Sequence, residues 1–276
     1  METIKPVLKN IISESPSRNN LFKWNLLKEY LQIVVLDFMY SHPAYSQLLF
    51  YGGSALAHCF GLERLSEDLD FIDEKKKINV SKLAKDLEDY FLKRTDLPVK
   101  TTVQKFRIYL KFPILHDLGL TTREETDTLF LKVEVYTDFD FCERYTTDIR
   151  PIFKFNRSLL IKTLDPPTLM ATKVRAILFR KWEKTDKQGK TTVKVKGRDY
   201  FDLLWYLQKG IQPNLSCIES FENMKDLKEK LLSVIARIDS RSIQLDLDAL
   251  IDNPNFVKNM SRNLKAILER EISEKL

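Results

Sequence analysis

A glycine turn and a pair of carboxylates stand close together in the N-terminal half of the sequence. Gly52, Gly53 and Ser54 supply a turn with a hydroxyl, and Asp68 and Asp70 follow in the segment SEDLDF. If the segment after Glu67 is a strand, alternation of side chains places both aspartates on one face and their apolar neighbours on the other. The polar face could hold a metal ion while the apolar face packs into a core. This pattern is typical of a site for a nucleotide phosphate and a metal.

A third carboxylate lies on a strand predicted further along the chain. In residues 128–136, four apolar side chains alternate with four others, and Glu134 is one of the latter. Hard divalent cations take oxygen ligands, and nucleotidyl transfer needs cations that also contact a triphosphate. Asp68, Asp70 and Glu134 together meet this requirement for Mg²⁺ or Mn²⁺. An isolated Asp-x-Asp is more often a pair of solvated side chains, but the preceding glycine turn favours the functional interpretation.

Hydrophobic spacing predicts the elements that must position these residues. Residues 48–51 form a short strand that runs into the glycines, and residues 54–60 begin a helix whose N-terminal amides face the turn, a geometry that suits a phosphate. Other predicted helices are 20–41, 81–92, 168–182, 199–208, 224–238 and 255–275, and other predicted strands are 68–72, 99–104, 106–112 and 128–136. The order indicates an α+β half followed by a helical half.

The size and composition are those of an ordinary globular protein. The chain has 276 residues, 43% of them apolar, and no run of about 18 apolar residues that could span a membrane. It also lacks an apolar signal segment at the N-terminus, so we expect a cytoplasmic protein without a membrane partner. Cys59, Cys142 and Cys217 have no spacing typical of zinc sites or disulfide frameworks, and we expect reduced thiols that pack in the interior. The net charge of +6 favours polyanionic partners weakly.

Four segments extend these observations to a known family. GGSALAHCFGLERLSEDLDF resembles the opening motif of the AbiEii/AbiGii nucleotidyltransferase toxins, which belong to the polymerase-β-like superfamily. LKVEV resembles the family's third-carboxylate strand, ATKVRAILFR its lysine helix with the pattern KxxAxxxR, and RDYFDLLWYL its RDxxDLxxYL helix. The four segments occur in the family's order between about residues 48 and 208, which makes the resemblance more specific than any one motif.

The resemblance implies an architecture and a set of site residues. The fold would be a polymerase-β-like core with a mixed sheet over residues 1–160, including N-terminal helices, and a helical lobe over residues 161–276 that completes the nucleotide site. The implied metal ligands are Asp68, Asp70 and Glu134, and the implied catalytic residues are these three with Lys173 and Asp202. The implied nucleotide contacts are Gly52, Gly53, Ser54, Arg64, Ser66, Lys173, Arg180 and Asp199.

The residues themselves leave several of these roles open. Lys173 and Arg180 lie seven positions apart, so on one helix they would share a face and could both reach a triphosphate. Asp199 and Asp202 would point away from the core, and Asp202 could instead form an i, i+4 ion pair with Arg198. Arg64 is about as well explained as a surface arginine, and His58 is better explained by packing than as a base.

The activity implied is the transfer of a nucleoside monophosphate from an NTP to an acceptor, by the toxin of a toxin–antitoxin or abortive-infection system with a separately encoded antitoxin. RNA, in particular a tRNA 3′ end, is the first acceptor we expect, because of the net charge and a lysine-rich loop predicted at residues 183–197. A protein hydroxyl is the second acceptor and an aminoglycoside-like small molecule the third. The alternative from another class is a nucleotide-binding interaction protein without turnover.

Overall fold

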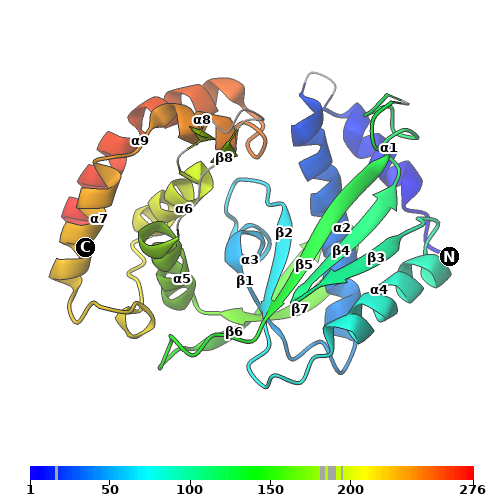
Figure 1. Ribbon diagram of the computed structural model, residues 1–276, viewed down its shortest axis with the longest axis horizontal. Helices are drawn as coiled ribbons and strands as arrows, with labels where there is room; N and C mark the ends of the chain where they lie inside the picture. Colours follow the sequence, from blue (N-terminus) through cyan, green and yellow to red (C-terminus); the bar gives the residue numbers. More distant parts are fainter. Residues whose placement is uncertain (16–17, 123, 181–183, 186–190, 194) are drawn as a thin grey trace. The chain divides into compact units, whose positions relative to one another are not determined.

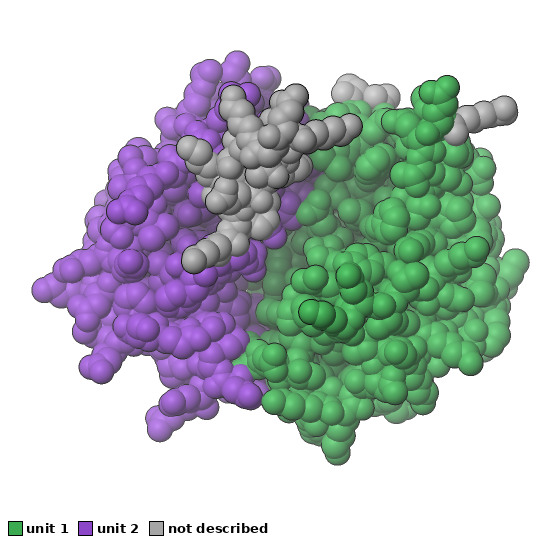
Figure 2. Space-filling view, viewed as in Figure 1, with its two compact units in different colours: residues 1–139, 147–163 green, residues 140–146, 164–276 purple. Residues whose placement is uncertain are grey.

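The computed structural model describes residues 1–15, 18–122, 124–180, 184–185, 191–193 and 195–276. The chain divides into two compact units, coloured separately in Figure 2. Unit 1 contains residues 1–139 and 147–163, and unit 2 contains residues 140–146 and 164–276. This division differs from the single boundary expected at residue 160, because a short earlier segment belongs to unit 2.

Unit 1 is built on a mixed sheet (Figure 1). In the described part of the chain its strand order is β3-β4-β5-β2-β1-β7-β6. The strands are β1 (Leu49–Tyr51), β2 (Asp68–Ile72), β3 (Lys100–Gln104), β4 (Arg107–Pro113), β5 (Thr128–Tyr136), β6 (Thr147–Lys154) and β7 (Arg157–Leu164). Strand β2 runs parallel to β5 and antiparallel to β1, whereas β4 is antiparallel to both β3 and β5. The mixed sheet confirms the predicted fold class for this half.

One face of this sheet is covered by helices. The helices of unit 1 are α1 (Lys5–Ser13), α2 (Asn20–Ser41), α3 (Gly52–Phe60) and α4 (Val80–Arg94). Helix α2 contacts β5, and α4 contacts β3 and β4. The apolar side chains of the strands, such as Leu110, Leu131 and Val133, are fully buried in one cluster with those of the helices. The alternation read from the sequence therefore fixes which face of β5 enters the core.

Unit 2 is mainly helical, as predicted. Its elements are α5 (Pro166–Phe179), α6 (Gly197–Gln208), the short 3₁₀ helix η1 (Leu215–Cys217), α7 (Met224–Ile235), α8 (Ser240–Leu247), α9 (Pro254–Lys275) and a hairpin of β8 (Lys184–Thr185) and β9 (Thr191–Val193). The prediction of α5 through residue 182 was wrong at its end, because Arg180 already has an extended backbone. The predicted loop 183–197 contains the hairpin, and its residues 183, 186–190 and 194 lie outside the described residues.

Two of the three cysteines depart from the prediction of separate thiols. Cys142 and Cys217 form a disulfide within unit 2, although 75 positions separate them in the sequence. Hydrogen bonds join the same segments: the backbone amide of Glu143 donates to the carbonyl of Ser216, and the side-chain amide of Asn214 donates to the carbonyl of Arg144 at 2.6 Å. Cys59 is a free thiol, and burial raises its pKa to about 12. This burial agrees with the packing role expected for Cys59.

Among the described residues, no helix has the length and apolar character needed to cross a membrane.

Candidate active site

The parallel pairing of β2 with β5 brings the three predicted carboxylates together. Asp70 is directly opposite Glu134, and Asp68 is opposite Lys132. The intervening Leu69 is fully buried on the other face of the sheet, as the two-residue period of a strand requires. The Asp70 and Glu134 carboxyls are close enough to share a hydrogen bond. Unit 1 therefore presents three acidic groups on one sheet face.

Three further side chains, which the sequence interpretation did not assign to the site, contact these carboxylates. The Lys132 ammonium lies 3.0 Å from Asp68 Oδ2 and 3.3 Å from Glu134 Oε1. Arg107 donates from Nε to Glu134 Oε1, and the Tyr136 hydroxyl donates to Glu134 Oε2. Lys132 and Tyr136 could have been found from strand alternation around Glu134, but Arg107 depends on the register of β4 with β5.

The surroundings shift the pKa values of Asp70 and Glu134 in opposite directions. Burial raises the pKa of Asp70, and the neighbouring charges of Asp68 and Glu134 raise it further. Burial also acts to raise the pKa of Glu134, but hydrogen bonds from Tyr136 and Arg107 and the charge of Lys132 hold it below its ordinary value. Glu134 is thus a stabilised anion, whereas the charge on Asp70 is poorly compensated within the protein.

The glycine turn lies directly against Asp70. Gly52 has a backbone φ of +79°, and a Cβ atom there would lie 2.6 Å from Asp70 Oδ2. A Cβ atom on Gly53 would lie 2.7 Å from a terminal nitrogen of Arg64. Helix α3 begins at Gly52, so its unpaired N-terminal amides start beside the carboxylates. Gly52 is therefore required by its positive φ and by the close approach of Asp70, whereas a side chain at Gly53 would displace the Arg64 guanidinium.

The Ser54 hydroxyl does not have the position expected of a phosphate contact. It is fully buried, and the hydroxyl donates to the backbone carbonyl of Asp68. The side chain ties the first turn of α3 to β2 at the residue that begins the acidic strand. In this arrangement a phosphate would meet backbone amides of the turn rather than the Ser54 hydroxyl.

A buried polar network supports the turn from behind. Arg64 is 5% exposed and donates to the carbonyl of Leu65 at 2.8 Å, so it is not a surface arginine. The Gln32 amide donates to the carbonyl of Ser66 at 2.9 Å, and its oxygen lies 2.9 Å from His58 Nε2. Burial lowers the pKa of His58 to about 3, so this neutral imidazole is a packing residue, as expected. Arg64 and Ser66 both lie beside Gly53.

Unit 2 contains a second charged cluster, formed by α5 and α6. The Lys173 ammonium lies 2.8 Å from Asp199 Oδ1 and 2.8 Å from Asp202 Oδ2. Both aspartates are buried, which contradicts the expectation that they point away from the core. Despite its burial, Asp199 has a lowered pKa because of the charges of Lys173 and Arg180. The cluster is therefore an ionised network inside unit 2.

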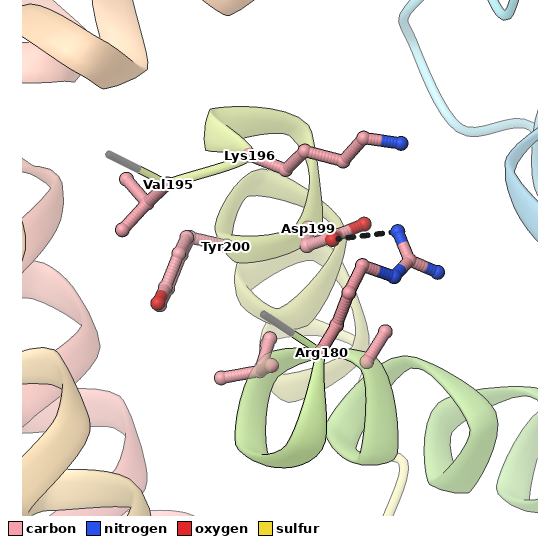
Figure 3. A pocket seen from close by; sticks show the side chains of 7 residues that line it. Arg180, Val195, Lys196, Asp199 and Tyr200 are labelled. Carbon is pink, nitrogen blue, oxygen red and sulfur yellow. Dashed lines mark ion pairs between the residues drawn. The ribbon is translucent and has the colours of Figure 1, made fainter. Parts of the chain in front are cut away.

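Two further expectations for this cluster are corrected. Arg198 forms its ion pair with Asp246, at 2.8 Å, and the ion pair of Asp202 is to Lys173. Arg180 follows the last turn of α5 instead of sharing a helix face with Lys173, yet its guanidinium still lies 3.6 Å from Asp199 (Figure 3). A cavity of about 130 Å³ adjoins this pair and is lined by Ala176, Ile177, Arg180, Val195, Lys196, Asp199 and Tyr200.

Comparison with known proteins identifies the family. A family described as nucleotidyl transferase AbiEii toxin, type IV TA system, matches residues 37–274. The chain belongs to the AbiEii family. This membership confirms the resemblance found in the sequence, makes the protein a nucleotidyltransferase, and implies a nucleotide substrate and an antitoxin partner. No curated protein matches the chain.

Solved structures provide weaker similarities. A candidate nucleotidyltransferase from H. pylori is 17% identical, covers 90% of this chain and 96% of its own, and has a TM-score of 0.47. An antigenic nucleotidyltransferase-like protein from Paracoccidioides brasiliensis is 16% identical, covers 80% of this chain and 93% of its own, and has a TM-score of 0.44. The assignment to AbiEii rests on the family match alone.

The acidic group of this AbiEii protein fits a divalent cation by its chemistry. It offers carboxylate oxygens, which Mg²⁺ prefers, and a cation would relieve the unfavourable charge on Asp70. In the part of the chain that the structure describes, no three such side chains are arranged as a complete set of metal ligands. The Lys132 ammonium instead lies between Asp68 and Glu134, where it serves as a positive charge for both.

Replacing Lys132 with methionine should make the AbiEii protein more dependent on metal for its stability. The substitution removes the positive charge between two carboxylates, and we expect the free energy of unfolding without metal to fall by about 1 kcal/mol. Added Mg²⁺ should raise the melting temperature of Lys132→Met more than that of the wild type. Thermal unfolding with and without Mg²⁺ measures both effects, with Lys82→Met on α4 as the control. Equal Mg²⁺ responses in all three proteins would contradict this interpretation of Lys132.

Replacing Gly52 with alanine should displace Asp70 and impair transfer. The methyl group would overlap Asp70 Oδ2, and a shift of about 1 Å in a reacting group can cost about 100-fold in rate. Positive φ adds about 1–2 kcal/mol of backbone strain to the alanine variant. Transfer rate and thermal stability are the measurements.

Gly61→Ala is the matched control for this substitution. Gly61 also has a positive φ, +75°, but a Cβ atom there meets nothing within 4 Å. It should lose a similar amount of stability and keep its transfer rate. If Gly52→Ala were as active as Gly61→Ala, the close approach of the turn to Asp70 would not matter for catalysis.

Proposed function

We propose that this AbiEii protein is a magnesium-dependent nucleotidyltransferase toxin that transfers a nucleoside monophosphate from an NTP to the 3′ end of an RNA, a tRNA in the first instance. The observation that carries the proposal is the position of Asp68, Asp70 and Glu134 on one sheet face, with the glycine turn of α3 directly against Asp70. Nucleotidyl transfer needs this combination of carboxylates and phosphate-binding amides.

The residues of unit 1 would divide the work as follows. Asp68, Asp70 and Glu134 would hold the cations, which when bound neutralise the triphosphate and lower the pKa of the attacking hydroxyl. The amides of Gly52 and Gly53 would bind phosphate oxygens. Arg107 and Tyr136 would hold Glu134 ionised and oriented through their hydrogen bonds. The acceptor oxygen forms a bond to the α-phosphorus, the bond from that phosphorus to the bridging oxygen breaks, and pyrophosphate and a proton leave.

The role proposed for unit 2 rests on the sequence motifs and on the ionised cluster. We propose that Lys173 and Arg180 contribute positive charge to binding of the triphosphate, and that Asp199 and Asp202 hold Lys173 in place. The two ion pairs of 2.8 Å support the positioning part of this role. Such a lysine would stabilise negative charge that develops on the leaving pyrophosphate.

The RNA acceptor is supported by charge. The chain carries 45 basic and 39 acidic residues, and contacts between basic side chains and phosphates would make acceptor binding sensitive to salt. A protein hydroxyl remains the second acceptor and an aminoglycoside-like small molecule the third. A protein that binds nucleotide without turnover is the alternative from another class.

Incubation with total RNA and each of the four NTPs, labelled at the α-phosphate, tests the proposal. With Mg²⁺ we expect label on RNA, enriched in the tRNA fraction, and none after chelation of the metal. Label on protein or on an added aminoglycoside would replace RNA as the acceptor. If no acceptor is labelled, yet Mg²⁺ and NTP together raise the melting temperature, the protein binds nucleotide without turnover.

A further inference from the structure

The sheet face that carries the carboxylates continues beyond them over β5, β4 and β3. Cross-strand pairing places Arg107 beside Glu134, Tyr109 beside Lys132, and Lys111 beside Phe130. One strand further out, Lys100 pairs with Lys111. Figure 1 shows these strands next to one another in unit 1. The active carboxylates are thus one end of a longer surface.

This surface is the side of the strands that the helices of unit 1 do not cover. The side chains of β4 and β5 that alternate with it, such as Ile108, Leu110 and Leu131, are fully buried in the core with α2 and α4. By contrast, Lys100 is exposed and Phe130 is 44% exposed. On this uncovered face the Phe130 ring therefore lies in solvent in a cross-strand row with Lys111 and Lys100.

Within β3 and β4 the charged side chains are all basic. Strands β3 and β4 contain no aspartate or glutamate, and Glu134 is the only acidic residue of β5. The register places four basic residues on this face: Lys100 and Lys111, and also Arg107 and Lys132, which form ion pairs with the carboxylates. A polyanion would therefore be attracted to β3 and β4, next to the group that would hold the metal.

Aromatic side chains lie among these cations. The Lys111 ammonium is 6.0 Å from the centroid of the Phe130 ring, and the Arg107 guanidinium lies 4.7 Å from that of Phe106. Sites for single-stranded nucleic acid combine basic side chains that follow the backbone with aromatic rings on which bases stack. Phe130 is four residues from Glu134, or about 13 Å along the strand, a distance that a few nucleotides can span. Duplex recognition does not need such an exposed ring.

We propose that this open face, defined by Lys100, Lys111, Tyr109 and Phe130, binds the single-stranded 3′-terminal nucleotides of the acceptor RNA. The two lysines contact phosphates, Phe130 stacks on a base, and the strand leads its terminal hydroxyl toward Glu134. This inference rests on the proposed function and identifies which part of the chain selects the acceptor.

Binding of a fluorescein-labelled single-stranded RNA, followed by anisotropy without NTP, tests the surface separately from catalysis. Lys100→Glu with Lys111→Glu should weaken binding at least about 10-fold and lower the slope of log affinity against log salt by about two. Phe130→Ala should weaken it by about 10-fold. Lys82→Glu with Lys85→Glu on α4 has the same charge change elsewhere in unit 1 and should bind like the wild type. A blunt RNA duplex should bind more weakly than the single strand.

Transfer kinetics complete the test. In both surface variants the KM for RNA should rise while the KM for NTP stays constant, and RNA should be labelled in preference to DNA of the same sequence. The proposal is overturned if the surface variants bind RNA like the α4 control, if the duplex binds better, or if label enters only DNA or protein. If the wild type transfers no label to any acceptor, yet the surface variants bind RNA more weakly than it does, the RNA-binding surface is supported and nucleotidyl transfer is rejected.

Discussion

Asp70→Asn should lose nucleotidyl transfer by about 1,000-fold or more and remain folded. The asparagine keeps the shape of the side chain but removes one of three converging negative charges, so that the site no longer holds a cation against the triphosphate. Removal of a single hydrogen-bond donor to the transition state typically lowers the rate by about 100- to 1,000-fold, and loss of a metal ligand should lower it at least as much. Because burial and its acidic neighbours make the charge on Asp70 unfavourable without metal, the variant should be as stable as the wild type or more so.

Initial rates of label transfer and thermal unfolding measure the two parts of this prediction. Asp89→Asn is a suitable control, since Asp89 lies on α4 and pairs with Lys93 at 2.9 Å. It should leave transfer unchanged. A rate for Asp70→Asn within about 10-fold of the wild-type rate would show that the three carboxylates are not the catalytic centre. Loss of general acid–base catalysis alone typically slows an enzyme by at least about 100-fold, and loss of a metal ligand should slow it more.

Lys173→Met should strongly destabilise unit 2. The substitution leaves Asp199 and Asp202 buried without the ammonium that lies 2.8 Å from each. Removal of one partner from a buried charge network typically costs about 3–5 kcal/mol. Arg180, at 3.6 Å from Asp199, can offset only part of this. Chemical denaturation followed by circular dichroism should therefore show an earlier unfolding transition.

A triple variant separates the structural role of Lys173 from its proposed catalytic role. The triple variant combines Lys173→Met with Asp199→Asn and Asp202→Asn. Because the two asparagines remove the buried charges that Lys173→Met alone leaves unpaired, stability should return to near that of the wild type. Transfer should remain lost, since the positive charge for the triphosphate is absent. Recovery of transfer together with stability would mean that Lys173 serves only to hold unit 2 together.

Strand alternation was the most informative part of the sequence. The two-residue period placed Asp68 and Asp70 opposite their apolar neighbours, and it did the same for Glu134. These are local properties of the backbone, so the face that each carboxylate occupies could be predicted, whereas the parallel pairing of β2 with β5 is what brings Glu134 to the two aspartates. The same alternation contained Lys132 and Tyr136, but their contacts with the carboxylates became evident only with the pairing of β2 and β5.

Features that depend on tertiary partners could not be predicted in this way. A helix pattern placed Asp202 on a polar face, whereas the structure buries it against Lys173 from another helix. A charge is buried where a partner compensates it, and no local spacing reveals that partner. The Arg107 contact likewise required the register of β4, and the Cys142–Cys217 disulfide joins segments 75 positions apart.

A comparison of NTP labelled at the α-phosphate with NTP labelled at the γ-phosphate tests the central claim most directly. The protein is incubated with RNA and Mg²⁺, and the products are separated by size and charge. We expect the α label to become covalently attached to RNA and the γ label to appear in pyrophosphate, in equal amounts. Attachment of the γ label to an acceptor, or its release as orthophosphate, would contradict nucleotidyl transfer.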